Sequence, residues 1–109
     1  RTLCRRHPNY RGTYAGSPAE RDAAYHQGTV WPWLFGPYFT ALCRWAGEKG
    51  RAEAVALFRG LAGLLTGGCL GTLPEICDGD PPHRARGCYA QAWSVAEPLR
   101  AAVEDLGLS

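Results

Sequence analysis

The sequence predicts an all-α domain of about three helices with one long ordered loop. Three segments, near residues 31–46, 51–65 and 91–106, repeat apolar residues at helical spacing. No segment shows the alternation typical of strands, and glycines and prolines separate the three periodic segments. Hydrophobic residues make up 46% of the 109-residue chain and charged residues 20%, which excludes an intrinsically disordered protein.

Residues 1–24 are predicted to form an extended, polar segment without a helix. Turn signals occur at Asn9-Tyr10-Arg11-Gly12 and at Gly16-Ser17-Pro18, and no helical period survives between them.

The first helix is predicted over 31–46. Thr29 is a candidate N-cap, Pro37 is expected to kink the helix, and Gly47 is expected to end it. One predicted face carries four apolar side chains at helical spacing: Leu34, Tyr38, Leu42 and Trp45.

The second helix, 51–65, carries a broad apolar stripe and ends at Gly67-Gly68. The third, 91–106, ends at Gly107. Ser94 and Glu97 have the spacing of a capping box, and Pro98 follows. Either this helix begins near Ser94, or Pro98 bends an earlier start. The three helices carry more apolar residues than they could bury among themselves, which favours a chain that packs against further helices.

The loop over 67–90 is the predicted place of the chemistry, since long loops inside compact domains are usually functional. Leu70, Leu73 and Ile76 indicate that it is buried. Glu75 lies between Pro74 and Ile76, and burial of a carboxylate is one way to tune a general acid or base. The alternative is an acid that accepts backbone N–H bonds and pins the loop.

Metal sites are not supported by the residue spacing. Asp78-Gly79-Asp80 is more typical of an Asx turn than of a ligand site, and it lacks the pattern of a calcium loop. Four potential zinc ligands occur in the loop, at Cys69, Cys77, His83 and Cys88, but their spacings fit no standard zinc site. No sequence feature marks any of the thiols as an activated nucleophile. The sequence predicts no metal and no cofactor.

A cluster of aromatic and polar residues indicates a sugar site. Tyr25-His26-Gln27 precedes Trp31, and Gln91-Ala92-Trp93 repeats the same chemistry at the start of the third helix. Aromatic faces can stack on sugar C–H surfaces while amide and imidazole groups bond to hydroxyls. The alternative is that the tryptophans belong to separate core clusters.

Charge and cysteine content limit the partners and the compartment. A net charge of +2 lacks the excess that nucleic-acid binding requires, and no apolar run is long enough to span a membrane. Five cysteines, an odd number without a C-x-x-C pair, favour reduced thiols and a cytoplasmic location. The chain starts at Arg1 and contains no Met, so we expect a piece of a longer gene product.

Several strings together resemble the amylo-α-1,6-glucosidase domain of glycogen debranching enzymes. The longest runs from Arg21 to Leu34 and includes YHQGTVWPW. Shorter matches follow in the same order: Gly68-Cys69-Leu70-Gly71, Pro74-Glu75-Ile76, Gly79-Asp80-Pro81-Pro82-His83 and Gln91-Ala92-Trp93-Ser94-Val95-Ala96-Glu97. The resemblance spans about Tyr10 to Arg100.

The resemblance implies that residues 1–109 form the C-terminal part of an (α/α)6 toroid. It implies inverting hydrolysis of α-1,6-linked glucose at branch points of glycogen or limit dextrin. Glu75 matches the family's general base, and the general acid, an Asp, belongs to an upstream part of the polypeptide. We therefore expect this chain alone to be inactive.

The implied substrate-binding residues are Tyr25, His26, Gln27, Trp31, Asp78, Asp80, Gln91 and Trp93. We expect His26 and Trp31 to share one pocket with Glu75, within roughly two helix diameters, about 20 Å. Two alternatives remain: a non-catalytic carbohydrate-binding or interaction module, and another (α/α)6 glycosidase of the glucoamylase type.

Overall fold

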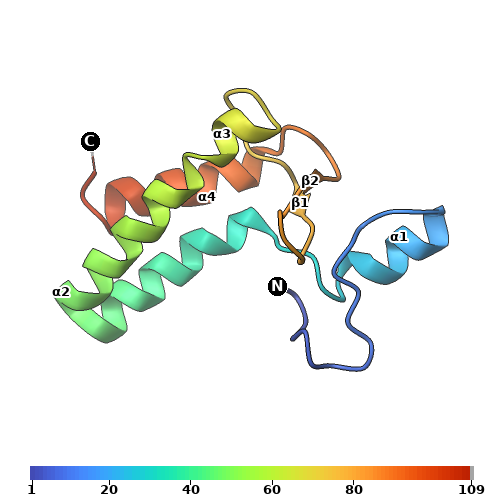
Figure 1. The fold of residues 1–109 in the computed structure, drawn as a ribbon. Coiled ribbons are helices and arrows are strands. Elements are labelled where there is room, and N and C mark those ends of the chain that lie inside the picture. Colours follow the sequence, from blue (N-terminus) through green and yellow to red (C-terminus); the bar gives the residue numbers. More distant parts are fainter. Residues whose placement is uncertain (109) are drawn as a thin grey trace.

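The structure, a computed structural model, describes residues 1–108 and is mainly helical (Figure 1). The all-α class is confirmed, although the described residues also contain one pair of two-residue strands. The elements in order are α1 (Pro18–Tyr25), the 3-10 helix η1 (Pro32–Leu34), α2 (Phe35–Leu61), α3 (Leu64–Gly67), β1 (Ile76–Cys77), β2 (Ala85–Arg86) and α4 (Ala92–Glu104).

Helix α2 is a helical hairpin, because it breaks at Gly47. This residue has φ 54° and ψ −136°, a backbone conformation that glycine adopts without the steric penalty of a side chain. The two limbs, 35–46 and 48–61, double back on each other in Figure 1. The predicted end of the first helix at Gly47 is thus confirmed. The second limb begins and ends a few residues earlier than the predicted 51–65, and α3 follows it.

The core lies between the limbs of α2 and α4. Its buried members are Phe39, Ala54, Leu61, Ala101 and Leu106. Helices α2 and α4 approach closely at Gly36, where an added Cβ would lie only 2.7 Å from the carbonyl oxygen of Glu97. At the other end of α4, the Arg51 guanidinium donates to the carbonyl oxygen of Leu106. This packing fixes the direction in which α4 leaves the long loop.

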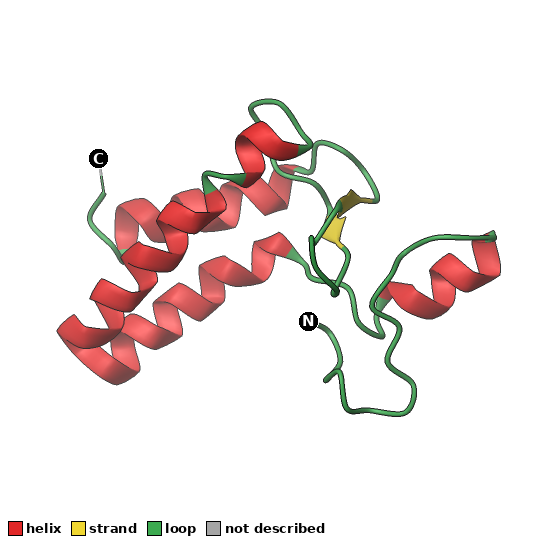
Figure 2. Ribbon diagram, in the orientation of Figure 1, coloured by secondary structure: helices red, strands yellow, loops and turns green. Residues whose placement is uncertain are grey.

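The prediction that residues 1–24 lack a helix is wrong, since α1 begins at Pro18. Ser17 is its N-cap: the Ser17 hydroxyl accepts from the backbone N–H of Glu20, and the Glu20 carboxylate accepts from that of Ser17. This reciprocal capping box, with proline in the first turn, is a start signal that the turn interpretation concealed. Helix α1 lies at the opposite end of the molecule from the α2 hairpin (Figure 2).

Two other expectations about helix 31–46 are also wrong. Thr29 caps no helix, since its hydroxyl donates to the Tyr25 carbonyl oxygen instead. Pro37 causes no kink, because it lies in the first turn of α2, where a missing N–H loses no bond. Of the two alternatives for the third helix, the earlier start is confirmed, because α4 begins at Ala92 with Pro98 inside it. Ser94 is therefore a buried helical residue rather than a cap, and Glu97 pairs with Arg100.

Much of the predicted apolar surface is exposed. Trp45 on α2 is 87% exposed, and Leu99 and Val103 on α4 are 57% and 60% exposed. Leu34 and Tyr38 are nearly half exposed, at 44% and 47%. Leu70, expected to be buried, is 89% exposed. The apolar excess noted in the sequence therefore forms an outer surface of this chain. Within residues 1–108, no helix combines the length and the apolar character that crossing a bilayer requires.

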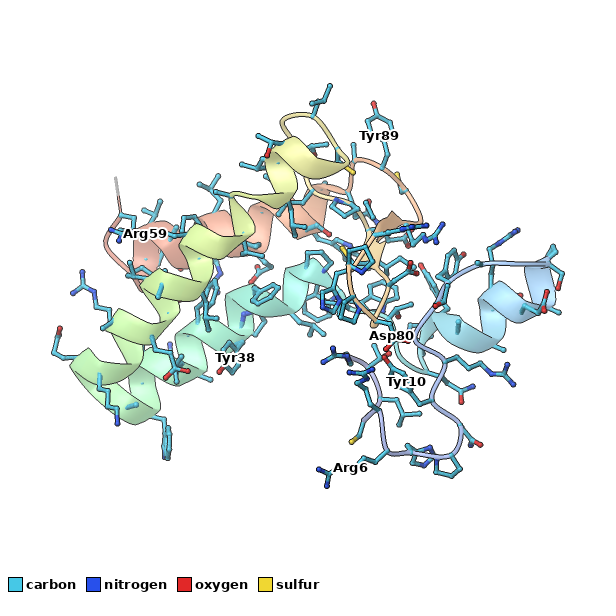
Figure 3. All side chains as sticks on the ribbon, in the orientation of Figure 1. Arg6, Tyr10, Tyr38, Arg59, Asp80 and Tyr89 are labelled. Atoms are coloured by element: carbon cyan, nitrogen blue, oxygen red, sulfur yellow. The ribbon has the colours of Figure 1, made fainter. Side chains whose placement is uncertain are left out.

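The long loop is fastened to two other segments. Strands β1 and β2 pair antiparallel within it, with Ile76 opposite Arg86. Cys77 also exchanges two backbone hydrogen bonds with Val30, just before η1. The N-terminal segment crosses the same loop, where the Gly12 carbonyl oxygen accepts from the N–H of Gly79. Figure 3 shows Tyr10 and Asp80 side by side at this crossing, and the Tyr10 hydroxyl donates to the Asp80 carboxylate.

Candidate active site

A pocket of about 510 Å³ lies where the end of α1, η1, the long loop and the start of α4 meet. Its size is in the range of small-molecule sites. Its walls contain aromatic, polar and carboxylate side chains: Thr2, Tyr25, His26, Trp31, Trp33, Leu34, Glu75, Gln91 and Trp93.

The backbone of the long loop fixes the position of Glu75 in this pocket. Its N–H donates to the carbonyl oxygen of Cys88, next to the β1–β2 pairing, at 2.8 Å. Glu75 directly precedes β1, whose Ile76 is fully buried and anchors the loop beneath it. The half-buried Glu75 carboxylate is therefore held by a hydrogen-bonded hairpin and does not lie on a free loop.

Both carboxylate oxygens of Glu75 accept hydrogen bonds from the protein. The Tyr25 hydroxyl donates to Oε1, and the backbone N–H of Cys88 donates to Oε2 at 2.9 Å. These two hydrogen bonds hold the carboxylate in one orientation and limit its rotation. Such a carboxylate is suited to accept a proton from a bound water molecule.

The aromatic wall is a continuous set of ring contacts. The rings of His26 and Trp31 are stacked, with centroids 5.2 Å apart and planes 6° apart. Trp93 contacts both Trp31 and Trp33, at centroid distances of 6.3 and 5.9 Å. Trp31 is buried and Trp93 is 47% exposed, so one tryptophan supports the wall and the other presents a face to solvent. An exposed indole face is a surface on which a sugar can stack.

The structure brings together six of the residues predicted for the site, and the shared-pocket expectation for His26, Trp31 and Glu75 is met. The six are Tyr25, His26, Trp31, Glu75, Gln91 and Trp93. Their roles in substrate binding and catalysis stay predictions.

Three other predicted substrate-binding residues do not line the pocket. Gln27 follows α1, and its carbonyl oxygen accepts from the backbone N–H of Arg11. Asp78 is 5% exposed; it accepts from the backbone N–H of Tyr14 and pairs with Arg86. Asp80 bonds to Tyr10 and Arg5. The contacts of Asp78 with Tyr14 and of Asp80 with Tyr10 and Arg5 join the loop to the N-terminal segment.

Thr2 and Leu34 were not predicted as pocket residues, and Trp33 was predicted only as part of the aromatic string and not as a substrate-binding residue. Trp33 and Leu34 lie within the string that carries the family resemblance, so their place beside Trp31 was a usable signal. No sequence signal marked Thr2, because its place in the pocket depends on the hydrogen bond from its backbone N–H to the Thr29 carbonyl oxygen.

The cysteines and acids of the loop do not form a metal site. Among residues 1–108, no three His, Cys, Asp or Glu side chains are close enough to hold a metal ion. Burial raises the pKa of the Cys77 thiol to about 11, so this thiol stays protonated at neutral pH and is a poor nucleophile.

An all-α scaffold that holds a carboxylate in a tryptophan-walled pocket is compatible with a glycosidase-type domain. The family model described as amylo-alpha-1,6-glucosidase matches residues 1–100. The chain belongs to this family, and its helical fold is compatible with part of an (α/α)6 toroid. The family is that of a glycogen-debranching, glycosidase-type domain. No curated protein and no solved structure matches the chain.

Substitution Gly87→Ala is expected to disturb Glu75 directly. Gly87 has φ +67°, and a Cβ there would lie 2.5 Å from Glu75 Oε2. The variant should lose about 1 kcal/mol of unfolding free energy from backbone strain. If Glu75 takes part in catalysis, kcat/KM should in addition fall about tenfold, because the carboxylate must move. Thermal unfolding and a hydrolysis assay of the complete protein measure the two effects.

The matched control is Gly71→Ala. Gly71 has a similar φ of +76°, but within residues 1–108 nothing lies within 4 Å of the added Cβ. It should show the strain alone, with activity retained. Equal loss of activity in both variants would contradict a specific effect on Glu75.

Proposed function

We propose that this chain carries the general base of an inverting amylo-α-1,6-glucosidase, and that Glu75 is this base. The substrate is an α-1,6-linked glucose at a branch point of glycogen or limit dextrin. The observation that carries the proposal is the Glu75 carboxylate, held by two donors in a pocket walled by Trp31 and Trp93.

In the proposed reaction, Glu75 takes a proton from a water molecule as this water attacks the anomeric carbon. A carboxylic acid on the other side of the sugar protonates the leaving oxygen. The two carboxyl groups of inverting enzymes stand roughly 6.5–9.5 Å apart, which leaves room for the water. Glu75 is the one acidic side chain lining this pocket within residues 1–108, so we propose that an upstream part of the same polypeptide supplies the acid.

The apolar outer surface supports this arrangement. Trp45, Leu99 and Val103 are exposed on the helices that form the core, and isolated soluble domains rarely expose so much apolar area. Further helices of the toroid would cover this surface and close the pocket. The three substrate contacts we propose first are stacking on Trp93 and hydrogen bonds from His26 and Gln91.

The stereochemistry of the product tests the proposal. The complete protein is given a dextrin with a single α-1,6-linked glucose stub, and the first product is followed by proton NMR before mutarotation. Inversion predicts that β-glucose appears first. Initial α-glucose would overturn the inverting mechanism. Preferred release of α-1,4-linked glucose would support a glucoamylase-type enzyme instead, and binding without hydrolysis would support a carbohydrate-binding module.

A further inference from the structure

The contact between Tyr25 and Glu75 joins two distant parts of the chain. Tyr25 is the last residue of α1, and its hydroxyl donates to Oε1 of a carboxylate 50 residues further along. The other carboxylate oxygen accepts from Cys88, within the loop itself. The loop therefore fixes one oxygen of Glu75, and α1 fixes the other.

Tyr25 is itself held in place by the segment that follows it. The carbonyl oxygen of Tyr25 accepts from the Thr29 hydroxyl at 2.5 Å and from the Trp31 indole N–H at 3.2 Å. Its ring packs edge-on against the rings of Trp31 and His26, at centroid distances of 4.7 and 4.8 Å. A side chain fixed at both its backbone and its ring can impose an orientation on its hydrogen-bond partner.

The Tyr25 hydroxyl is available as a donor over the whole neutral range. Desolvation, the hydrogen bond to Glu75 and the charge of Glu75 together raise the pKa of Tyr25 to about 12. The charge of the neighbouring Tyr14, whose ring centroid lies 5.7 Å away, also raises the pKa of Tyr25. At neutral pH Tyr25 therefore stays protonated, as a donor must.

We infer that Tyr25 is a positioning residue that holds the Glu75 carboxylate in the orientation needed to accept a proton from water, and not a residue that binds the sugar. This inference rests on the proposed function of Glu75. A base that is oriented before the substrate arrives loses no freedom during the reaction. Removal of the hydroxyl should therefore act on turnover rather than on substrate binding.

Kinetics of Tyr25→Phe in the complete protein test the role. The variant keeps the ring and its contacts but loses the donor. We expect kcat to fall about 10- to 100-fold, the range that corresponds to one hydrogen bond to a charged group, and KM to change little. The control is Tyr14→Phe, whose hydroxyl makes no hydrogen bond to Glu75 and which should keep its kcat. A rise in KM at unchanged kcat would overturn the inference and return Tyr25 to substrate binding.

A second measurement needs no activity. With tyrosine labelled at Cζ, NMR follows the ionisation of each hydroxyl, and Tyr25→Phe assigns the Tyr25 signal. At a pH of about 11, where ordinary phenols are ionised, Tyr25 should remain protonated. In Glu75→Gln it should ionise at lower pH, because a neutral amide no longer opposes the phenolate charge. Circular dichroism confirms that each variant is folded at the pH used.

The two measurements separate the inference from the proposed function. An unchanged Tyr25 titration beside an inactive Glu75→Gln would overturn the positioning role alone. Full hydrolysis by Glu75→Gln would overturn the proposed function of Glu75. The contact between Tyr25 and Glu75 would then have no role in catalysis.

Discussion

Glu75→Gln is expected to lower kcat about 10³-fold or more in the complete protein, with little change in affinity for malto-oligosaccharides. The amide has nearly the shape of the carboxylate, and its single oxygen can still accept a hydrogen bond from either Tyr25 or Cys88. What it cannot do is take a proton from water. Initial rates on a branched dextrin measure the loss, and calorimetry on the same samples measures binding.

The matched control for this substitution is Glu53→Gln. Glu53 is an exposed glutamate on the second limb of α2, and the same chemical change there should leave the rate unaltered. Should Glu75→Gln retain more than about a tenth of the original kcat, Glu75 would be an acid that pins the loop, the alternative that its sequence context already allowed.

Asp78→Asn is expected to lower the unfolding free energy by about 2 kcal/mol. The buried Asp78 carboxylate accepts from the backbone N–H of Tyr14 at 2.8 Å and from the Arg86 guanidinium at 3.1 Å. The substitution removes the charge that partners Arg86 and weakens the bond to the N-terminal segment. Thermal or urea unfolding measures the change.

Asp80→Asn, two residues further on, is the natural comparison. Asp80 and Arg5 are 37% and 59% exposed, so the loss of this pair should be less than about 1 kcal/mol. The same two variants test the substrate-binding prediction for these acids. A rise in KM for Asp78→Asn without loss of stability would contradict the anchoring role and support direct contact with the glucan.

The helical part of the fold could be predicted because its signals are local. The break at Gly47 and the start of α4 beside Gln91 follow from glycine conformation and apolar period. Helix α1 was missed because Gly16-Ser17-Pro18 is a turn signal. The helix start is recognised only when Ser17 is read together with Glu20, three residues later, as a capping box. Which apolar face is buried could not be predicted either. Phe39 and Trp45 are equally apolar in sequence, and tertiary contacts alone separate them.

The sequence predicted which residues line the pocket better than it predicted the hydrogen bonds that hold the loop in place. Glu75, Trp31 and Trp93 were identified by residue type and by resemblance, and the structure places them around one pocket. The anchoring contacts of Asp78 could not be predicted, because their partners, Tyr14 and Arg86, lie in segments whose pairing no local pattern encodes.

The way the loop is fastened has a consequence for the order of folding. The α2 hairpin closes through neighbouring residues, whereas the bonds that fasten the long loop join residues 50 and 64 positions apart, such as Tyr25 with Glu75 and Tyr14 with Asp78. Contacts between distant residues carry a larger loop-closure entropy and form more slowly. We therefore expect the helices to form first and the pocket to assemble last. By the same reasoning, amide protons at Glu75 and Cys77 should exchange through local opening while those of Phe39 await global unfolding.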